Sequence, residues 1–316
     1  MRIEICGFYG FGNAGDEAIL QAIMDQLGNN EYIISTSLPY SYNAFQNYGK
    51  ITGKEIRLHE DMRTDFDAYI LGGGNLNWGY GWRQCLSIFS KNMPCMNYAV
   101  GYNKRWYYGE KLHKLYYEFL KNFDVITVRD ESSFNLIKQI SPELNPVLTF
   151  DPALTLKEEK WDCPMNKIAV FPKYEDDNIP NQPQLDWLIQ ELKDVSEEVI
   201  LIACAPKNME NIDVDTNLCN YLKDRLKGSS IVDISPFEPR KMKYLISQSK
   251  IVYSGGRYHP IVFAIAHDIP YRISPTSSYI KVHQLTEMHK KYGKQKLIEL
   301  ANNNRELFSA LKIKTG

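Results

Sequence analysis

The sequence predicts an α/β protein with two doubly wound parallel sheets. Short apolar runs alternate along the chain with segments whose apolar residues recur at helical spacing. Glycine-rich turns follow several of these runs, as is usual in strand-to-helix connections. At 316 residues the chain is also long enough for two domains of ordinary size. Strands that alternate with helices favour parallel pairing, because each helix carries the chain back to the start of the next strand.

The first half of the chain begins with an apolar run at residues 3–8. A glycine-rich connection follows, and a helical pattern then starts near Ala18. Further strands are predicted at residues 32–35, 68–71, 94–101 and 125–128, and a helix is predicted at residues 112–120. The charged residues 157–160 (KEEK) mark a boundary between domains.

The second half repeats the alternation after this boundary. Its predicted strands cover residues 168–171, 199–203, 230–234 and 251–254, and its helices cover residues 185–192, 217–226 and 240–247. Two more helical patterns, at residues 280–292 and 294–311, close the chain. We therefore expect Rossmann-like lobes at residues 1–154 and 155–277, and a helical tail at residues 278–316 that packs back across them.

Composition excludes several classes of protein. The 37 basic and 38 acidic side chains nearly cancel, so no overall field draws the chain to nucleic acid or to an anionic membrane. No apolar stretch reaches the about 18 residues of a membrane span, and the first residues lack a signal-peptide pattern. We expect a cytoplasmic protein with, at most, a peripheral association with a lipid-linked molecule. The six cysteines lack metal-ligand spacing, which predicts neither a metal site nor a disulfide framework.

Aromatic residues are concentrated in two segments, 78–82 and 102–108, within a chain that has 21 tyrosines. They are equally compatible with a flat surface for a sugar and with an interface between subdomains.

The turn at residues 254–260 (SGGRYHP) is the most informative segment. It follows an apolar strand and precedes an apolar helix, so its free backbone N–H groups and the helix dipole form an anion site. Arg257 adds a permanent cation, and His259 can exchange a proton near neutral pH. A tight turn with a solvated arginine and a space-filling histidine is the alternative. The combination of residues favours the functional interpretation.

A second glycine-rich turn, at residues 10–15 (GFGNAG), matches the spacing of a dinucleotide site. That site also requires an acidic residue after the second strand, and residues 34–37 (ISTS) contain none. Asn13, Asp16 and Glu17 place polar and negative groups where a pyrophosphate would approach. We therefore interpret this turn as a site for hydroxyl groups.

Several segments together resemble the polysaccharide pyruvyl transferase family. They follow the family's order over nearly the whole chain: residues 7–18 (GFYGFGNAGDEA), 72–76 (GGGNL), 127–132 (TVRDES), 151–153 (DPA) and 256–264 (GRYHPIVFA). The resemblance implies a glycosyltransferase-B-like fold and phosphoenolpyruvate as a co-substrate. It also implies transfer of a pyruvyl group to hydroxyls of a sugar in a cell-surface polysaccharide or its precursor. The products are a pyruvate ketal and phosphate, and no metal or tightly held cofactor is expected.

The resemblance also suggests roles for individual residues, with the acceptor on the first lobe and the donor on the second. His259 is the expected general acid, which protonates the methylene carbon of the donor beside the catalytic cation Arg257. The expected donor-binding residues are Arg129, Gly255, Gly256, Arg257 and Lys281. The expected acceptor-binding residues are Gly12, Asn13, Asp16, Glu17, Gly73, Gly74 and Asn75.

Structural roles compete with some of these assignments. Asp130 is better explained as a helix cap and Asp151 as a cap at the domain boundary. Arg129 either binds the donor, which we favour, or pairs with a carboxylate. At the level of the whole protein, the alternatives are a glycosyltransferase of the same architecture that uses a nucleotide sugar, and a non-catalytic glycan-binding protein.

Overall fold

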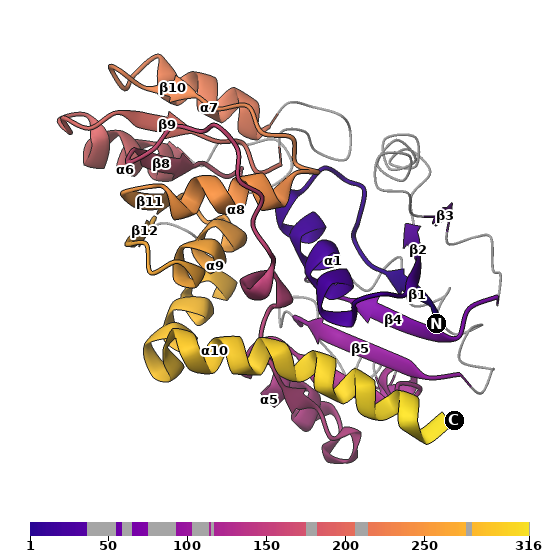
Figure 1. The fold of residues 1–316 in the computed structure, drawn as a ribbon. Coiled ribbons are helices and arrows are strands. Elements are labelled where there is room, and N and C mark those ends of the chain that lie inside the picture. Colours follow the sequence, from indigo (N-terminus) through magenta and orange to yellow (C-terminus); the bar gives the residue numbers. More distant parts are fainter. Residues whose placement is uncertain are drawn as a thin grey trace. The chain divides into compact units, whose positions relative to one another are not determined.

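The computed structural model describes residues 1–36, 55–58, 65–74, 93–102, 114, 117–174, 182–205, 214–275 and 280–315. Within these residues the protein contains two parallel sheets with flanking helices, which confirms the predicted α/β class (Figure 1). The chain divides into two compact units. The first unit consists of Met1–Gly10, Ile19–Thr155 and Gln295–Gly316, and the second consists of Phe11–Ala18 and Leu156–Lys294.

The sheet of the first unit has the strand order β3-β2-β1-β4-β5-β6-β7, and every recorded pair of neighbours is parallel. Its strands are β1 (Arg2–Cys6), β2 (Glu31–Thr36), β3 (Glu55–Leu58), β4 (Ala68–Gly72), β5 (Cys95–Val100), β6 (Val125–Val128) and β7 (Val147–Leu148). Its helical segments are α5 (Glu131–Ile140), η2 (Pro142–Leu144) and η3 (Pro152–Thr155). Each residue of β4 and β5 is buried, as expected for central strands of a parallel sheet.

The sheet of the second unit has the order β10-β9-β8-β11-β12, again with parallel neighbours. Its strands are β8 (Ile168–Phe171), β9 (Val199–Leu201), β10 (Ser230–Ile231), β11 (Ile251–Ser254) and β12 (Tyr271–Ile273). Its helices are α6 (Gln182–Leu192), α7 (Asp215–Lys223), α8 (Pro239–Ser247) and α9 (Tyr258–Ala266). Its core packs β8 and β9 against apolar side chains of α6 and α7, including Leu188 and Leu218.

Two helices have residues in both units. The first turn of α1 (Ala14–Leu27) groups with the second unit, and the helix from Ile19 onward groups with the first. The C-terminal helix α10 (Ile280–Thr315) contains a non-helical residue, Gly293, whose φ is 70° and ψ is 164°. This break separates two helical segments, as the two predicted patterns require. Among the described helices, none combines the length and apolar character of a membrane span.

The C-terminal segment of α10 belongs to the first unit, where the buried side chain of Asn304 bonds it to other segments. Asn304 accepts a hydrogen bond from the Thr127 hydroxyl on β6 at 2.7 Å and donates to the carbonyl of Phe150 at 3.2 Å. Asn304 and Thr127 are both fully buried, so these bonds satisfy groups that water does not reach. Asn304 is therefore part of the core of the first unit.

Candidate functional site

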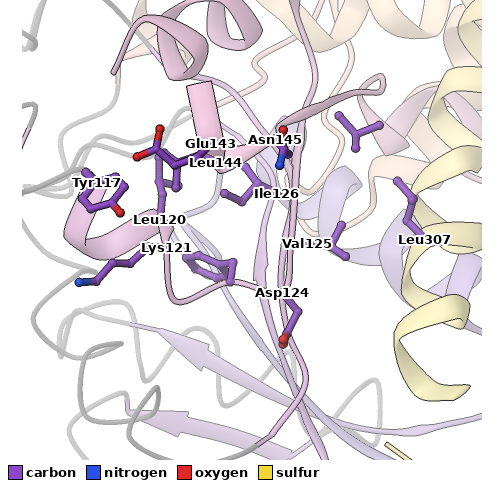
Figure 2. A pocket seen from close by; sticks show the side chains of 12 residues that line it. Tyr117, Leu120, Lys121, Asp124, Val125, Ile126, Glu143, Leu144, Asn145 and Leu307 are labelled. Carbon is purple, nitrogen blue, oxygen red and sulfur yellow. The ribbon is translucent and has the colours of Figure 1, made fainter. Parts of the chain in front are cut away.

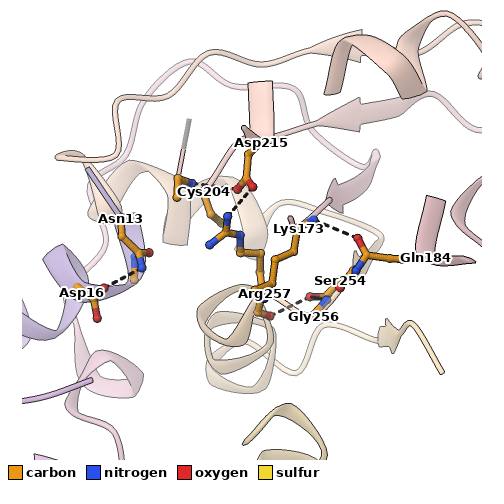
Figure 3. A network of polar contacts seen from close by, with 12 residues as sticks. Asn13, Asp16, Lys173, Gln184, Cys204, Asp215, Ser254, Gly256 and Arg257 are labelled. Carbon is orange, nitrogen blue, oxygen red and sulfur yellow. Dashed lines mark hydrogen bonds and ion pairs between the residues drawn. The ribbon is translucent and has the colours of Figure 1, made fainter. Parts of the chain in front are cut away.

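The strand order of the second sheet reverses beside β8, its first strand along the chain. β8 pairs with β9 on one side and with β11 on the other. In open α/β sheets, ligands bind outside the carboxyl ends of the strands at such a reversal. Lys173 follows β8, Cys204 follows β9, and the turn at residues 255–257 follows β11. Because the strands are parallel, these three loops lie at one edge of the sheet, where Figure 3 shows their polar contacts.

The turn after β11 has the strand–turn–helix structure that the sequence predicts. The Gly255 N–H donates to the carbonyl of Phe171 on β8 at 2.9 Å. The Ser254 hydroxyl accepts from the Gly256 N–H at 3.1 Å and donates to the Arg257 carbonyl at 2.8 Å. Gly256 has a φ of 119°, which a residue with a side chain rarely adopts. Helix α9 begins directly after Arg257, so the turn ends at a helix N-terminus.

Arg257 is held by a buried carboxylate. Its Nη2 donates to Asp215, which is fully buried at the start of α7, whereas the Arg257 side chain keeps 14% exposure. The second oxygen of Asp215 accepts from the N–H of Ala205, in the loop after β9, at 3.0 Å. Asp215 therefore fixes the guanidinium and links the loops after β9 and β11 (Figure 3). Sequence reasoning missed Asp215, whose one local signal is its place at the start of a helix.

His259 lies in the first turn of α9, with its Nε2 buried. The Tyr258 ring contacts the imidazole edge-on, with ring centroids 5.2 Å apart. The backbone of Gly15 packs so closely on the ring that a Cβ at residue 15 would lie 1.9 Å from Nδ1. A glycine at position 15 is thus required by the histidine at position 259, and the structure brings together two turns that the sequence singles out separately.

The glycine-rich turn before α1 is organised as a helix cap. The Asn13 side chain accepts from the Gly15 N–H at 3.1 Å and donates to the Asp16 carboxylate at 2.7 Å. The N–H of Ala14 donates to the carbonyl of Cys204 at 2.9 Å, which ties the cap to the loop after β9. Glu17 is fully buried in the same first turn. These contacts explain the residue types structurally, and the acceptor-binding roles of Gly12, Asn13, Asp16 and Glu17 stay predictions.

Arg129 has a structural role in the first unit. Its Nη1 donates to Asp151 at 2.7 Å, and the two side chains are 1% and 0% exposed. This arrangement favours the carboxylate pairing that the sequence left as the alternative to donor binding. Asp130 accepts from the Ser133 N–H at 2.8 Å as the N-cap of α5, and Asp151 accepts from the Ala153 N–H at 3.0 Å. The predicted capping roles of both aspartates are confirmed.

The remaining predicted residues are divided between the two units. Gly73, in the first unit, faces Ile19 so closely that a Cβ would lie 1.9 Å from that side chain, which gives it a packing role. The Gly74 carbonyl accepts from the Gly101 N–H at 2.9 Å. Lys281 lies in the first turn of α10 in the second unit. Asn75 and residues 78–82 lie outside the described residues. The binding roles of these residues stay predictions.

Comparison with protein families identifies the chain. Residues 13–272 match the family model described as polysaccharide pyruvyl transferase, which is most of the sequence. The chain belongs to this family. It is therefore an enzyme of pyruvyl transfer, and the family implies a sugar or polysaccharide acceptor. No curated protein shows significant similarity to the sequence.

Solved structures show the fold of this pyruvyl transferase. It is similar to the UDP-GlcNAc 2-epimerase of Neisseria meningitidis bound to UDP-GlcNAc, with 13% identity, 99% and 100% of the two chains covered, and a TM-score of 0.54. The Anabaena protein HepE in complex with UDP-glucose gives 11% identity, coverage of 98% and 95%, and a TM-score of 0.55. The glycotransferase of kitacinnamycin gives 9% identity, coverage of 98% and 93%, and a TM-score of 0.51. The predicted two-lobed, glycosyltransferase-B-like fold is confirmed.

A cavity of about 370 Å³ lies in the first unit of the pyruvyl transferase (Figure 2). It is lined by residues at the starts of β6 and β7, with apolar side chains such as Leu120 and Ile126 and the carboxylates of Asp124 and Glu143. Ligands of parallel sheets bind at the carboxyl ends of the strands, whereas this cavity adjoins their amino ends. We therefore locate the candidate site at the loops after β8, β9 and β11.

The cysteine nearest these loops is not poised for nucleophilic chemistry. The pKa of Cys204 is raised to about 12, mainly by burial; the charge of Arg257 lowers it and that of Asp215 raises it by smaller amounts. Four of the five described cysteines, including Cys204, are buried. Arg257, His259 and the backbone of the turn stay the predicted carriers of the chemistry at these loops.

Proposed function

We propose that this pyruvyl transferase uses phosphoenolpyruvate as its donor and forms a pyruvate ketal on two hydroxyls of a sugar. The observation that carries the proposal is the arginine of the 254–260 turn, which Asp215 orients two residues before a histidine in the first turn of α9. Arg257 supplies a fixed cation for the anionic groups of phosphoenolpyruvate. His259 supplies a proton donor for its methylene carbon.

The anionic groups of the donor fit the turn. A carboxylate can accept two parallel hydrogen bonds from an arginine fork, and the N–H groups at the start of α9 add partial positive charge. Because Asp215 fixes the guanidinium, little side-chain entropy is lost when the donor binds.

The reaction requires a proton at carbon. His259 gives its proton to the methylene carbon, while a sugar hydroxyl attacks the neighbouring carbon and loses its own proton. The C–O bond to phosphate then breaks, and phosphate leaves with the proton of the first hydroxyl as HPO₄²⁻. A second hydroxyl closes the ketal and returns its proton to the neutral imidazole of His259. These steps use proton transfer and fixed charge alone, and they require no metal or tightly held cofactor.

Calorimetric titration with phosphoenolpyruvate tests the donor assignment. Arg257→Ala should weaken binding by about 2–4 kcal/mol, which corresponds to a loss of roughly 30-fold to 1000-fold. Arg257→Lys should recover only part, because an ammonium does not reproduce the fork. Arg272→Ala is the control, since Arg272 belongs to the same unit but is 58% exposed and pairs with Glu191. A folded Arg257→Ala protein that binds phosphoenolpyruvate at full strength refutes the assignment, and selective binding of UDP-glucose supports a glycosyltransferase instead.

The role of His259 is tested separately from binding. His259→Gln should lower turnover by roughly 100-fold or more and leave donor affinity within a few-fold, because proton transfer occurs in the transition state. In deuterated water, deuterium should enter the pyruvyl methyl group. His283→Gln on α10 is the matched control. A stable His259→Gln enzyme with unchanged rate and pH profile places the acid elsewhere.

A further inference from the structure

We propose that Lys173 is the second cation of the donor site and binds the phosphate of phosphoenolpyruvate, while Arg257 binds its carboxylate. The assignment of these two groups rests on the proposed function. Lys173 has no distinctive motif around it in the sequence, and its significance follows from the sheet topology and from one buried amide.

The topology places Lys173 beside the 254–260 turn. Strands β8 and β11 are neighbours in which Phe171 pairs with Ser254. Lys173 and Gly256 are each two residues beyond this pair, on strands that lie about 4.8 Å apart in any sheet. Lys173 therefore lies at the reversal of strand order, and its backbone is next to that of Gly256, the residue before Arg257.

The amide of Gln184 connects the two segments. Gln184 is 1% exposed; its Oε1 accepts from the Lys173 N–H at 3.2 Å, and its Nε2 donates to the Gly255 carbonyl (Figure 3). A Cβ on Gly255 would lie 2.3 Å from the same Oε1, so the turn closes tightly on this side chain. One side chain thus holds the backbone of both cation-bearing segments in a fixed relation.

The burial of Lys173 sets it apart from an ordinary surface lysine. Its exposure is 7%, and burying an ammonium is costly unless other groups stabilise the charge. A second buried lysine, Lys243, is 4% exposed and has a structural role: its Nζ donates to the Leu156 carbonyl at 2.7 Å and lies 5.8 Å from the centroid of the Phe263 ring. Lys243 is on α8, where its Nζ is held by the Leu156 carbonyl, and supplies a matched control.

The donor carries two anionic groups, and the second unit holds cationic side chains for them. Asp215 neutralises Arg257, and Asp151 neutralises Arg129 inside the first unit. A phosphate monoester carries about −1.5 to −2 at neutral pH, in addition to the carboxylate of the donor. Lys173 places a second cationic side chain at the same edge of the sheet as Arg257. Its compact ammonium suits a tetrahedral phosphate, whereas the planar guanidinium suits a planar carboxylate.

The test uses the full-length enzyme with three probes: phosphoenolpyruvate, inorganic phosphate, and pyruvate, which carries only the carboxylate. For Lys173→Met we expect phosphoenolpyruvate binding to weaken at least roughly 30-fold, phosphate binding to disappear and pyruvate affinity to stay within a few-fold. Arg257→Ala should instead remove pyruvate binding. Lys173→Arg should keep most phosphate affinity, and Lys243→Met should bind all three probes as the wild type does.

The outcomes separate the two proposals. Failure of the wild-type enzyme to bind phosphoenolpyruvate refutes the proposed function itself. If the wild type binds it and a folded Lys173→Met protein binds it equally well, the inference is wrong and the second cation lies elsewhere, for example at Lys281. Loss of pyruvate binding with intact phosphate binding in Lys173→Met also overturns the inference. Lys173→Gln, which keeps a polar end, decides the case if the methionine variant does not fold.

Discussion

Replacement of Gly15 by alanine tests the contact between the two turns of the candidate site. Gly15 lies in the first turn of α1, and an alanine there would normally favour a helix by up to about 1 kcal/mol. Here the new Cβ would lie 1.9 Å from His259 Nδ1, against 3.4 Å for an ordinary contact, so the two groups must separate by about 1.5 Å. A 1 Å misplacement of a reacting group can cost roughly 100-fold in rate. We therefore expect Gly15→Ala to lower turnover by at least about 100-fold.

Three measurements follow this displacement. Phosphate release from phosphoenolpyruvate in the presence of a sugar acceptor reports turnover. Long-range ¹H–¹⁵N spectra of the histidine rings report a change at His259 without any substrate. Urea unfolding reports stability, which should decrease by about 1–3 kcal/mol because the site is overpacked.

A double-substitution cycle supplies the control. In a His259→Ala background the obstructing ring is absent, so Gly15→Ala should now stabilise the protein by up to about 1 kcal/mol. The effect on stability therefore reverses in sign between the two backgrounds. A folded Gly15→Ala enzyme with wild-type turnover and an unchanged His259 spectrum refutes the proposed coupling of the two turns.

Two further predictions concern stability. Asp151→Asn should lower the free energy of unfolding by about 3–5 kcal/mol, because it leaves the buried charge of Arg129 uncompensated. Arg129→Met in the same chain should restore part of the loss. Urea unfolding measures both effects, and a loss below about 1 kcal/mol for Asp151→Asn contradicts the buried pairing. Because burial raises the pKa of Cys204 to about 12 from its ordinary value near 9, the unfolded chain loses this proton first as pH rises. Between about pH 9 and pH 12, deprotonation of Cys204 in the unfolded chain lowers the free energy of unfolding by about 1.4 kcal/mol per pH unit. Cys204→Ala should flatten the decline measured in urea at pH 9–11, and an unchanged slope argues against a neutral buried thiol.

The local sequence predicts the elements of the fold well where they are strongly apolar. The central strands of both sheets and the break between the two C-terminal helical patterns follow directly from it. The edge strand β12 was missed, because it is half exposed and has an arginine at its centre. The strand β7 was missed because it has only 2 residues. Short edge strands depend on their neighbours for hydrogen bonds more than on their own apolar pattern.

The candidate site was predictable only in part. The glycines, arginine and histidine of residues 254–260 form a local pattern, and their conformation follows from it. Asp215 is 42 residues from Arg257 in sequence, so no local pattern indicates that it orients the guanidinium. The sequence also does not show that Arg129 faces Asp151, nor that Gly15 is small because His259 packs on it. Tertiary contacts decide these roles.

The discontinuity of both units has a consequence for how the protein is made. The first unit needs Gln295–Gly316, and the second needs Phe11–Ala18, so neither is a contiguous piece of sequence. During synthesis, β6 emerges long before Asn304, which is 177 residues away from its hydrogen-bond partner Thr127. The turn before α1 likewise lacks the Ala14–Cys204 hydrogen bond and the packing of Gly15 on His259 until those later residues have been synthesised. The polar core of the first unit and the candidate site are therefore completed late in translation. A chain truncated before the C-terminal segment of α10 lacks Asn304 and leaves the buried Thr127 hydroxyl without this hydrogen bond.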